Sequence, residues 1–207
     1  MSATRTLAYS ATCSRQRTSA ERAKLSATQA IDFTKLDRFN LHDYYLSRNL
    51  EEGRGDKVCL IVGEETLTYA ELEERVARCA AALRSLGVKP GERVLMVLPD
   101  GFEFAEVWFA VLRVGAVFAM VNPLIHAEQF EHYLSYSGAR VAFGHADLLE
   151  GLAAAARASE SCEALVVIGG CEEDEQLRDY ESLLSAEDPS SERAVCEPTG
   201  PNDVCGW

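Results

Sequence analysis

Cysteine and histidine are the residues of this 207-residue sequence that could bind a metal ion or act as a nucleophile and its base. The seven cysteines form no Cys-x-x-Cys pair, and none shares a zinc-type spacing with a histidine. His126 and His132 lie six positions apart, which on a helix is about 240° of rotation, so both cannot face one ion. The pattern therefore predicts no metal ligand. It predicts reduced, mostly buried thiols at Cys13, Cys59, Cys79, Cys162, Cys171, Cys196 and Cys205.

Three acidic residues at spacings of three could form a general acid and base pair, namely Asp100, Glu103 and Glu106. The helix expected there is otherwise apolar, and acids at that spacing commonly mark the solvent-exposed edge of such a helix. We therefore expect these carboxylates at the surface rather than in catalysis. The acidic run at residues 172–175 lacks the spaced glycine and oxygen ligands of a calcium loop, so it is predicted to be a solvated loop.

The sequence contains no Walker loop, dinucleotide fingerprint or nucleophile elbow. Residues 53–57 lack the Gly-Lys-Ser/Thr ending of a Walker loop, and Gly169-Gly170 is followed by acids instead of further glycines. Arg54-Gly55-Asp56 matches an adhesion tripeptide, but without a secretion signal it is interpreted as a loop between a helix and a strand. The residues alone thus predict no catalytic and no cofactor-binding side chain.

The elements that would position chemical groups alternate between strand and helix. Apolar runs predict strands at residues 58–62, 66–68, 93–98, 117–121, 140–144 and 164–168. Helical periodicity predicts helices at residues 41–49, 68–86, 101–114, 127–137, 147–158 and 180–184. This alternation, with continuously apolar strands, is typical of an α/β fold with an open, mostly parallel sheet flanked by helices.

Two local patterns fix element boundaries. Thr68, followed three residues later by Glu71, forms a capping box that starts a helix. The apolar stretch at residues 104–125 is long enough to cross a membrane, but it contains Arg113, which is costly at the centre of a bilayer. The stretch is therefore expected to divide at Gly115 into a buried helix and a buried strand.

Charge is unevenly distributed along the chain, whose net charge is −13. Residues 94–207 carry five basic and twenty acidic side chains. Such a surface repels phosphate groups, so we expect neither nucleic acid nor a membrane as a partner.

The first 20 residues are rich in Ser, Thr and Arg and contain no acid, which is typical of an organellar transit peptide. They lack a clear apolar face, so a disordered tail, or a start codon assigned too far upstream, is favoured instead. We expect residues 1–38 to be a disordered or poorly ordered tail and residues 39–207 to form one domain. Without a signal-peptide core, the expected location is cytoplasmic.

Four segments, in order, resemble the adenylate-forming superfamily of acyl- and aryl-CoA ligases, peptide-synthetase adenylation domains and luciferases. The segment Leu67–Leu72 is similar to the first core motif, and Leu112–Val117 running into Val121-Asn122-Pro123 is similar to the second. The segment Gly87–Val94 resembles the turn between the two motifs, and Ser137–Arg140 resembles the turn after them. The resemblance implies the N-terminal subdomain of the ligase fold over residues 39–207.

Within the superfamily, the sequence is most similar to the benzoate-CoA ligase group. The similarity lies in Phe39-Asn40, Tyr44-Tyr45-Leu46 and residues 52–57. In that family a carboxylic acid and ATP form an acyl-adenylate with loss of pyrophosphate, and coenzyme A then gives a thioester. The resemblance implies ATP, magnesium and coenzyme A as cofactors of a complete enzyme, and an aromatic or aliphatic carboxylic acid as its partner.

The segment Asp203–Trp207 resembles the family strand that leads into a Ser/Thr/Gly-rich phosphate loop, and the sequence stops there. No catalytic residue of the family can therefore be carried over to this chain. We expect the N-terminal part of an aryl- or acyl-CoA ligase, cut before the phosphate loop and inactive alone.

Two alternatives remain open at this point. One is a non-catalytic binding or regulatory module derived from the family. The other is an independent nucleotide-binding domain with a doubly wound sheet, although the Gly-rich first turn is absent. A fragment would expose an apolar strand at Val204–Trp207 and could associate through it, whereas an evolved module would cover that edge.

Overall fold

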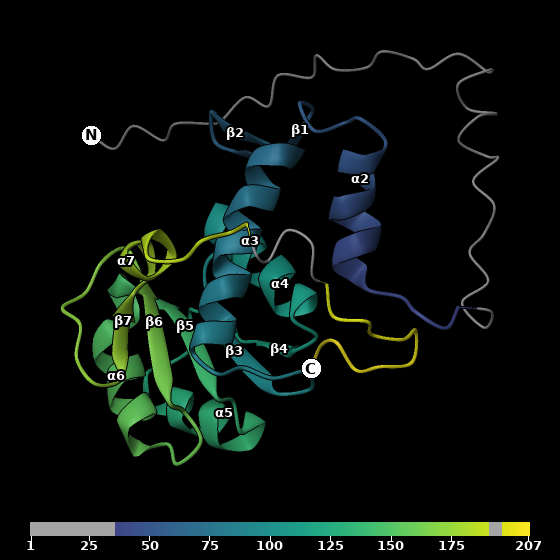
Figure 1. Ribbon diagram of the computed structural model, residues 1–207. Coiled ribbons are helices and arrows are strands. Elements are labelled where there is room, and N and C mark those ends of the chain that lie inside the picture. The colour runs from purple at the N-terminus through teal and green to yellow at the C-terminus, as the bar shows by residue number, and fades with distance from the viewer. Residues whose placement is uncertain (1–35, 191–195) are drawn as a thin grey trace, which may run out of the picture. The chain divides into compact units, whose positions relative to one another are not determined.

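The computed structural model describes residues 36–190 and 196–207, and Leu36–Trp207 forms one compact unit. Its centre is a five-stranded parallel sheet in the order β4-β3-β5-β6-β7 (Figure 1). The predicted α/β fold with an open parallel sheet is confirmed. Residues 1–35 of the predicted tail lie outside the described residues. The strands are β3 (Arg93–Val97), β4 (Val117–Met120), β5 (Val141–His145), β6 (Ala164–Ile168) and β7 (Leu177–Asp179).

Successive side chains of each central strand enter two different hydrophobic clusters. In β3, Val94 and Met96 belong to one cluster, while Leu95 and Val97 belong to the other. All four are almost fully buried. The sheet therefore needs helices on both faces, which explains why its strands read as continuous apolar runs.

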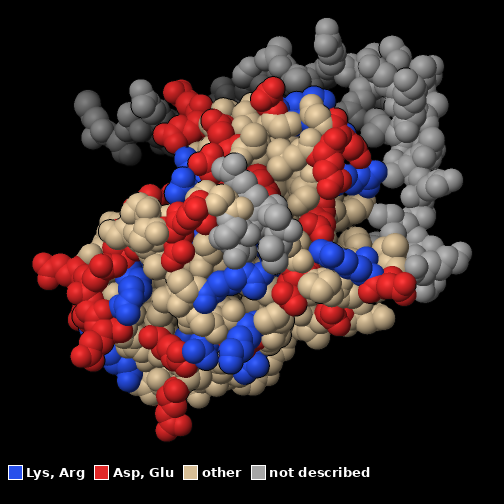
Figure 2. All heavy atoms as spheres, in the orientation of Figure 1, with Lys and Arg blue, Asp and Glu red and all other residues tan. Residues whose placement is uncertain are grey.

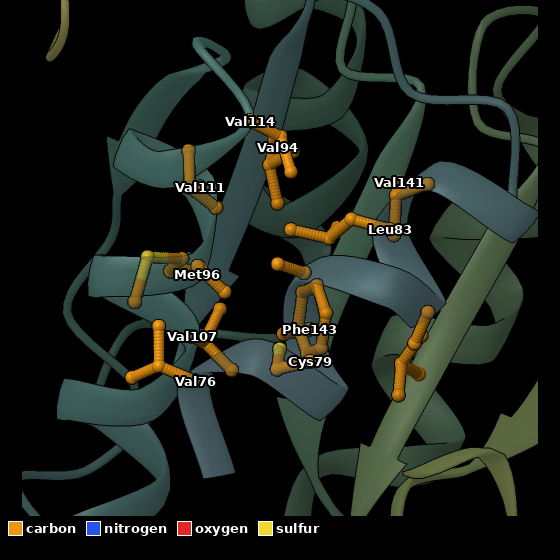
Figure 3. Close-up of a cluster of buried hydrophobic side chains, with 14 of the residues drawn as sticks. Val76, Cys79, Leu83, Val94, Met96, Val107, Val111, Val114, Val141 and Phe143 are labelled. Carbon is orange, nitrogen blue, oxygen red and sulfur yellow. The ribbon is translucent and has the colours of Figure 1, made fainter. Parts of the chain in front are cut away.

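Helices α3, α4 and α7 cover one face of the sheet, and α5 and α6 cover the other. Figure 3 shows the first cluster, in which Val76, Cys79 and Leu83 of α3 meet side chains of the strands. Burying each such side chain contributes about 1.5–3 kcal/mol, so the two clusters are the main stabilising term. The helices are α3 (Tyr69–Ser85), α4 (Phe102–Arg113), α5 (Glu128–Ser137), α6 (Leu149–Ala158), which follows a 3-10 turn η3 (Ala146–Leu148), and α7 (Tyr180–Ser185).

A separate antiparallel hairpin precedes α3. It consists of β1 (Val58–Val62) and β2 (Glu65–Thr68), and it ends on the residue that caps the helix. The Thr68 hydroxyl accepts a hydrogen bond from the backbone N–H of Glu71 at 3.3 Å, and the Glu71 carboxylate accepts one from the Thr68 N–H at 2.8 Å. The predicted capping box is confirmed.

The first helical segment contains a turn of π-helix. It comprises η2 (Asp43–Ser47) and α2 (Arg48–Glu51), close to the predicted helix over residues 41–49. The Asn40 side chain accepts a hydrogen bond from the N–H of His42 at 2.8 Å and so starts this segment. Single π turns are rare in proteins, and those that occur are often found at functional sites. This one begins at Asp43, directly after His42, and so sets the positions of both residues.

The apolar stretch at residues 104–125 divides as predicted. Helix α4 ends at Arg113, Gly115 adopts a left-handed conformation with φ of 71°, and β4 follows. Glycine is suited to this turn because it has no side chain to disfavour a positive φ. None of the helices in the described part of the chain combines the length and the apolar character needed to cross a bilayer.

Two features near the C-terminus differ from the prediction. The acidic run at residues 172–175 is an exposed loop as expected, but Leu177–Asp179 unexpectedly pairs with β6 as strand β7. It has three residues, of which only Leu177 is buried, so it carries too little pattern to be recognised. The expected strand at residues 203–207 is reduced to a single parallel bridge between Phe118 and Gly206.

Replacing Thr68 by alanine should lower the free energy of unfolding by about 1 kcal/mol, because the first turn of α3 loses its cap. Chemical denaturation followed by circular dichroism measures this change. The matched control is Thr66→Ala, an exposed threonine of the same strand with no capping role. Equal effects of the two substitutions would contradict the capping argument.

Candidate functional site

A crevice lies at the carboxyl ends of the parallel strands. It has a volume of about 390 Å³ and is lined by residues at or just after the ends of β3, β5, β6 and β7. In the strand order β4-β3-β5-β6-β7 the strand after β3 is added on one side of it and the later strands on the other, so the order of strands reverses between β3 and β5. Open α/β sheets bind ligands outside the carboxyl ends of the strands at such a point. We call this hollow the carboxyl-edge crevice. Its lining is Leu98, Pro99, Asp100, Gly101, Glu103, Phe104, His145, Ile168, Gly169, Gly170, Asp179 and Glu181.

The carboxyl-edge crevice is acidic. Asp100, Glu103, Asp179 and Glu181 contribute four carboxylates, and its lining includes no lysine or arginine. The Asp179 carboxylate also caps α7 by accepting a hydrogen bond from the N–H of Ser182 at 2.9 Å. A site of this charge cannot neutralise a triphosphate, because phosphate oxygens need cationic or N–H donors around them.

An apolar hollow of about 500 Å³ adjoins the crevice at the carboxyl ends of β3 and β4. Its outer part is formed by the turn after β4, where the Asn122 side chain accepts a hydrogen bond from the N–H of Leu124 at 2.9 Å. Leu124 is 89% exposed and Met120 is 47% exposed. Exposed apolar side chains beside a crevice can receive the hydrocarbon part of a ligand.

The structure separates the three acids of the predicted surface row. Asp100 and Glu103 line the carboxyl-edge crevice, but Glu106 is only 1% exposed, so the prediction of a solvent-exposed position was wrong for that residue. The Glu106 carboxylate accepts hydrogen bonds from the Tyr180 hydroxyl at 2.7 Å and from Arg75 at 2.9 Å. Burial raises the pKa of Glu106, and these two donors offset only part of that effect. The prediction failed because the spacing between Glu103 and Glu106 carries no information about α7, which covers Glu106 through Tyr180.

A second group of charged residues is buried between α3, α4 and the first helical segment. We call His42, Glu73 and Arg113 the buried charged cluster. Arg113 pairs with Glu73, and His42 Nε2 lies 3.1 Å from Glu73 Oε2 and 3.1 Å from Arg113 Nη1. Burial alone would raise the pKa of Glu73, but His42 and Arg113 outweigh it and hold that pKa below its usual range. The sequence analysis did not predict this cluster. The arginine within an otherwise apolar helix indicated it, because a buried arginine needs an acidic partner.

The thiols are more exposed than predicted. Of the six described cysteines only Cys79 and Cys162 are buried, so the prediction of mostly buried thiols was wrong, while their unpaired state was predicted correctly. Burial raises the pKa of Cys162 to about 11. Burial and the neighbouring Asp43 carboxylate raise the pKa of Cys196 to about 12, so neither thiol is a good nucleophile near neutral pH.

Comparisons with known proteins agree with the fold and with the motif order. Residues 46–207 match the family described as AMP-binding enzyme. The benzoate–CoA ligase of Thauera aromatica is 37% identical over 172 residues, covering 83% of this chain and 31% of the relative. The crystal structure of a benzoate CoA ligase from Burkholderia xenovorans LB400 is 32% identical with a TM-score of 0.69, covering 82% of this chain and 32% of that one.

A third comparison concerns the fold alone. The crystal structure of an anthranilate CoA ligase in complex with anthranoyl-AMP has a TM-score of 0.76 and 23% identity, covering 85% of this chain and 33% of that chain. An open parallel α/β sheet is therefore shared with these CoA ligases. The chain belongs to the AMP-binding enzyme family. Benzoate–CoA ligases are among its most similar relatives, and the chain spans a quarter to a third of their length.

The pH dependence of stability should reveal the raised pKa of Glu106. A carboxyl group whose pKa is higher in the folded state stabilises the fold below its unfolded value of 4.5, and this contribution is lost as pH rises through the folded pKa. The unfolding free energy of the wild type, minus that of Glu106→Gln, should therefore fall as pH rises from 4.5 towards neutrality. Denaturant titrations across this interval measure the difference. Glu131→Gln, at an exposed position, controls for the loss of one negative charge, and a difference that rises with pH would contradict the argument.

Removing Arg113 should destabilise the fold strongly. Arg113→Ala leaves Glu73 buried without its main cationic partner, which costs about 3–5 kcal/mol of unfolding free energy. The double variant Glu73→Gln, Arg113→Met should recover most of this loss, since no uncompensated carboxylate remains. Arg48→Ala, which breaks an exposed pair with Glu52, serves as the control and should change little. A single variant that is as stable as the control would show that the pair is not needed.

Proposed function

We propose that this chain is the N-terminal part of an ATP-dependent aryl-CoA ligase and that it does not form an acyl-adenylate alone. The observation that carries the proposal is the 37% identity to a benzoate–CoA ligase over 83% of the chain. A solved benzoate CoA ligase with the same fold supports it. The match lies in a region that builds the sheet and its carboxyl edge, where ligands of open α/β sheets bind.

The proposed reaction of the complete enzyme has two steps. A carboxylate oxygen of the acid attacks the α-phosphorus of ATP and pyrophosphate leaves, giving the acyl-adenylate. The thiol of coenzyme A then displaces AMP and forms the thioester. ATP, magnesium and coenzyme A are the proposed cofactors, and an aromatic carboxylic acid is favoured over an aliphatic one because the relatives at 37% and 32% identity are named benzoate ligases.

The described residues do not fit the triphosphate of ATP. The carboxyl-edge crevice presents four carboxylates and no lysine or arginine, so it would repel the phosphates. Activation of a carboxylate requires those phosphates to be held with their charge neutralised. This mismatch supports a division of labour, in which residues other than those described hold ATP while this part supplies the sheet edge and the adjoining apolar hollow.

The course of the C-terminal segment also supports this division. Gly206 pairs with Phe118 in the parallel sense, so the chain runs alongside β4 towards the carboxyl edge of the sheet. Val204 and Trp207 are 66% and 59% exposed, which agrees with the proposed association of other chain segments with this strand. We also propose a cytoplasmic location, which the unpaired thiols of the described cysteines support.

Pyrophosphate release tests the proposal. The purified chain is incubated with ATP, magnesium and a panel of aromatic and fatty acids, alone and mixed with a separately expressed C-terminal portion of a related benzoate–CoA ligase. We expect no release from the chain alone and acid-dependent release from the mixture, with benzoate preferred. The controls are each component alone and the mixture without acid.

Each other outcome has a definite meaning. Release by the chain alone would contradict the proposed inactivity. Silence of the mixture, with both parts folded by circular dichroism, would contradict the ligase role and favour a non-catalytic module. Release with fatty acids alone would overturn the preference for aromatic substrates.

A further inference from the structure

Three side chains of different chemical type meet beside the first helical segment. His42 and Asp43 lie at the start of that segment, and Cys196 lies 154 positions beyond His42 in the sequence. The Cys196 sulfur is 4.0 Å from His42 Nδ1, and the nearer Asp43 oxygen, Oδ1, is 3.7 Å from the same nitrogen. The three potential ligand atoms all lie within 4.8 Å of one another.

Contacts on the Nε2 side of the His42 ring, away from Asp43 and Cys196, set its orientation. The ring is fully buried, and Nε2 lies 3.1 Å from Glu73 Oε2, while Arg113 donates to the other Glu73 oxygen. Arg113 Nη1 also lies 3.1 Å from Nε2. In the neutral tautomer that carries its proton on Nε2, this N–H is donated to Glu73, both carboxylate oxygens have a donor, and the Nδ1 lone pair faces Cys196 and Asp43. A carboxylate that accepts the remote N–H of a histidine is the usual support of a metal-binding imidazole.

The surroundings of Asp43 leave one of its oxygens available. Arg38 lies 3.5 Å from Oδ2, so it faces the oxygen that points away from His42. The hydroxyl of Ser47 lies 3.3 Å from both Oδ1 and His42 Nδ1 and is the polar neighbour that an ion would displace or recruit. Asp43 and Cys196 are half-buried, so solvent can reach the open side of the group.

We propose that His42 Nδ1, Asp43 Oδ1 and Cys196 Sγ form a binding site for Zn²⁺, with water as the fourth ligand. Nitrogen, oxygen and sulfur donors together are a set that zinc accepts in tetrahedral geometry. Zinc bonds of about 2.0–2.3 Å place neighbouring ligand atoms about 3.3–3.6 Å apart. The present distances from His42 Nδ1, 3.7 Å to Asp43 Oδ1 and 4.0 Å to Cys196 Sγ, need a closure of less than 1 Å, and the Asp43 and Cys196 ligand atoms lie within 4.8 Å of each other. On binding, the thiol proton of Cys196 passes to solvent and the sulfur binds as thiolate.

The ion would join the C-terminal segment to the core. That segment already docks through main-chain hydrogen bonds, from Glu197 N–H to the Arg113 carbonyl at 2.9 Å and from Phe39 N–H to the Thr199 carbonyl at 2.7 Å. Zinc adds a bond to Cys196 at the start of the same segment, which then runs alongside β4. The site lies beside the C-terminal end of α4, at the amino edge of the sheet, so the proposed structural role is independent of the proposed ligase activity.

Metal titration of the full chain tests the site. Chelator-treated protein is titrated with Zn²⁺ in competition with a chromophoric chelator, and in parallel with Co²⁺, which reports tetrahedral geometry and thiolate binding by its absorption. We expect one ion per chain, a sulfur-to-cobalt charge-transfer band and a rise in thermal midpoint on adding zinc. Cys196→Ser should abolish the band and weaken zinc binding by roughly ten-fold or more, and Asp43→Asn should weaken binding but keep the band.

Matched controls separate this site from adventitious binding. Cys205→Ser removes another half-buried thiol of the same segment and should leave zinc affinity and the cobalt band unchanged. The wild-type cobalt spectrum tests the proposal even where a variant folds poorly. Three results would overturn it: a wild type that binds no zinc at micromolar concentration, a cobalt spectrum without a thiolate band, or a Cys196→Ser protein that binds as tightly as the wild type.

Discussion

The C-terminal end of α4 is the point on which the rest of the structure depends. Its last residue, Arg113, buries a guanidinium against Glu73 of α3, and carbonyls of the final turn accept hydrogen bonds from two other segments. The Asn40 amide reaches the Leu112 carbonyl at 2.8 Å, and the Glu197 N–H reaches the Arg113 carbonyl at 2.9 Å. Chain segments from both ends of the described domain are therefore held by one helix terminus, and the two buried charges are tolerated only because they neutralise each other.

The two edges of the sheet differ in how their charged side chains are arranged. The amino edge, where α4 ends, contains paired charges that lock the elements together. The carboxyl edge presents the acids Asp100 and Glu103 beside an apolar hollow. Figure 2 shows basic side chains interspersed with acidic ones on the visible face. A chain of net charge −13 with an acidic crevice repels anions, so it needs cationic groups from elsewhere to hold a triphosphate.

Much of this fold could be predicted because its determinants are local. Each central strand is a continuous apolar run, and Thr68 with Glu71 marks the start of α3 within four residues. The features that the sequence did not predict all depend on contacts between residues far apart in the chain. Strand β7 depends on pairing with β6 more than on its own sequence, the burial of Glu106 depends on Tyr180, and the group of His42, Asp43 and Cys196 joins residues from opposite ends of the domain. No spacing rule can detect contacts that only the folded topology creates.

The C-terminal end of α4 also explains the residues at the start of the second core motif, Leu112–Val117. Gly115 turns the chain with φ of 71°, and a Cβ atom there would lie 2.5 Å from the Glu197 side chain, so the glycine allows both the turn and the close approach of the C-terminal segment. Arg113, two residues earlier, supplies the charge that orders Glu73, and Glu73 in turn orients His42. The spacing of arginine and glycine therefore serves the assembly of this helix end. Because the segment that it anchors runs alongside β4 towards the carboxyl edge, this assembly step decides where the chain arrives relative to the crevice. A motif at the amino edge of the sheet thus fixes the path of a segment that runs towards the opposite edge.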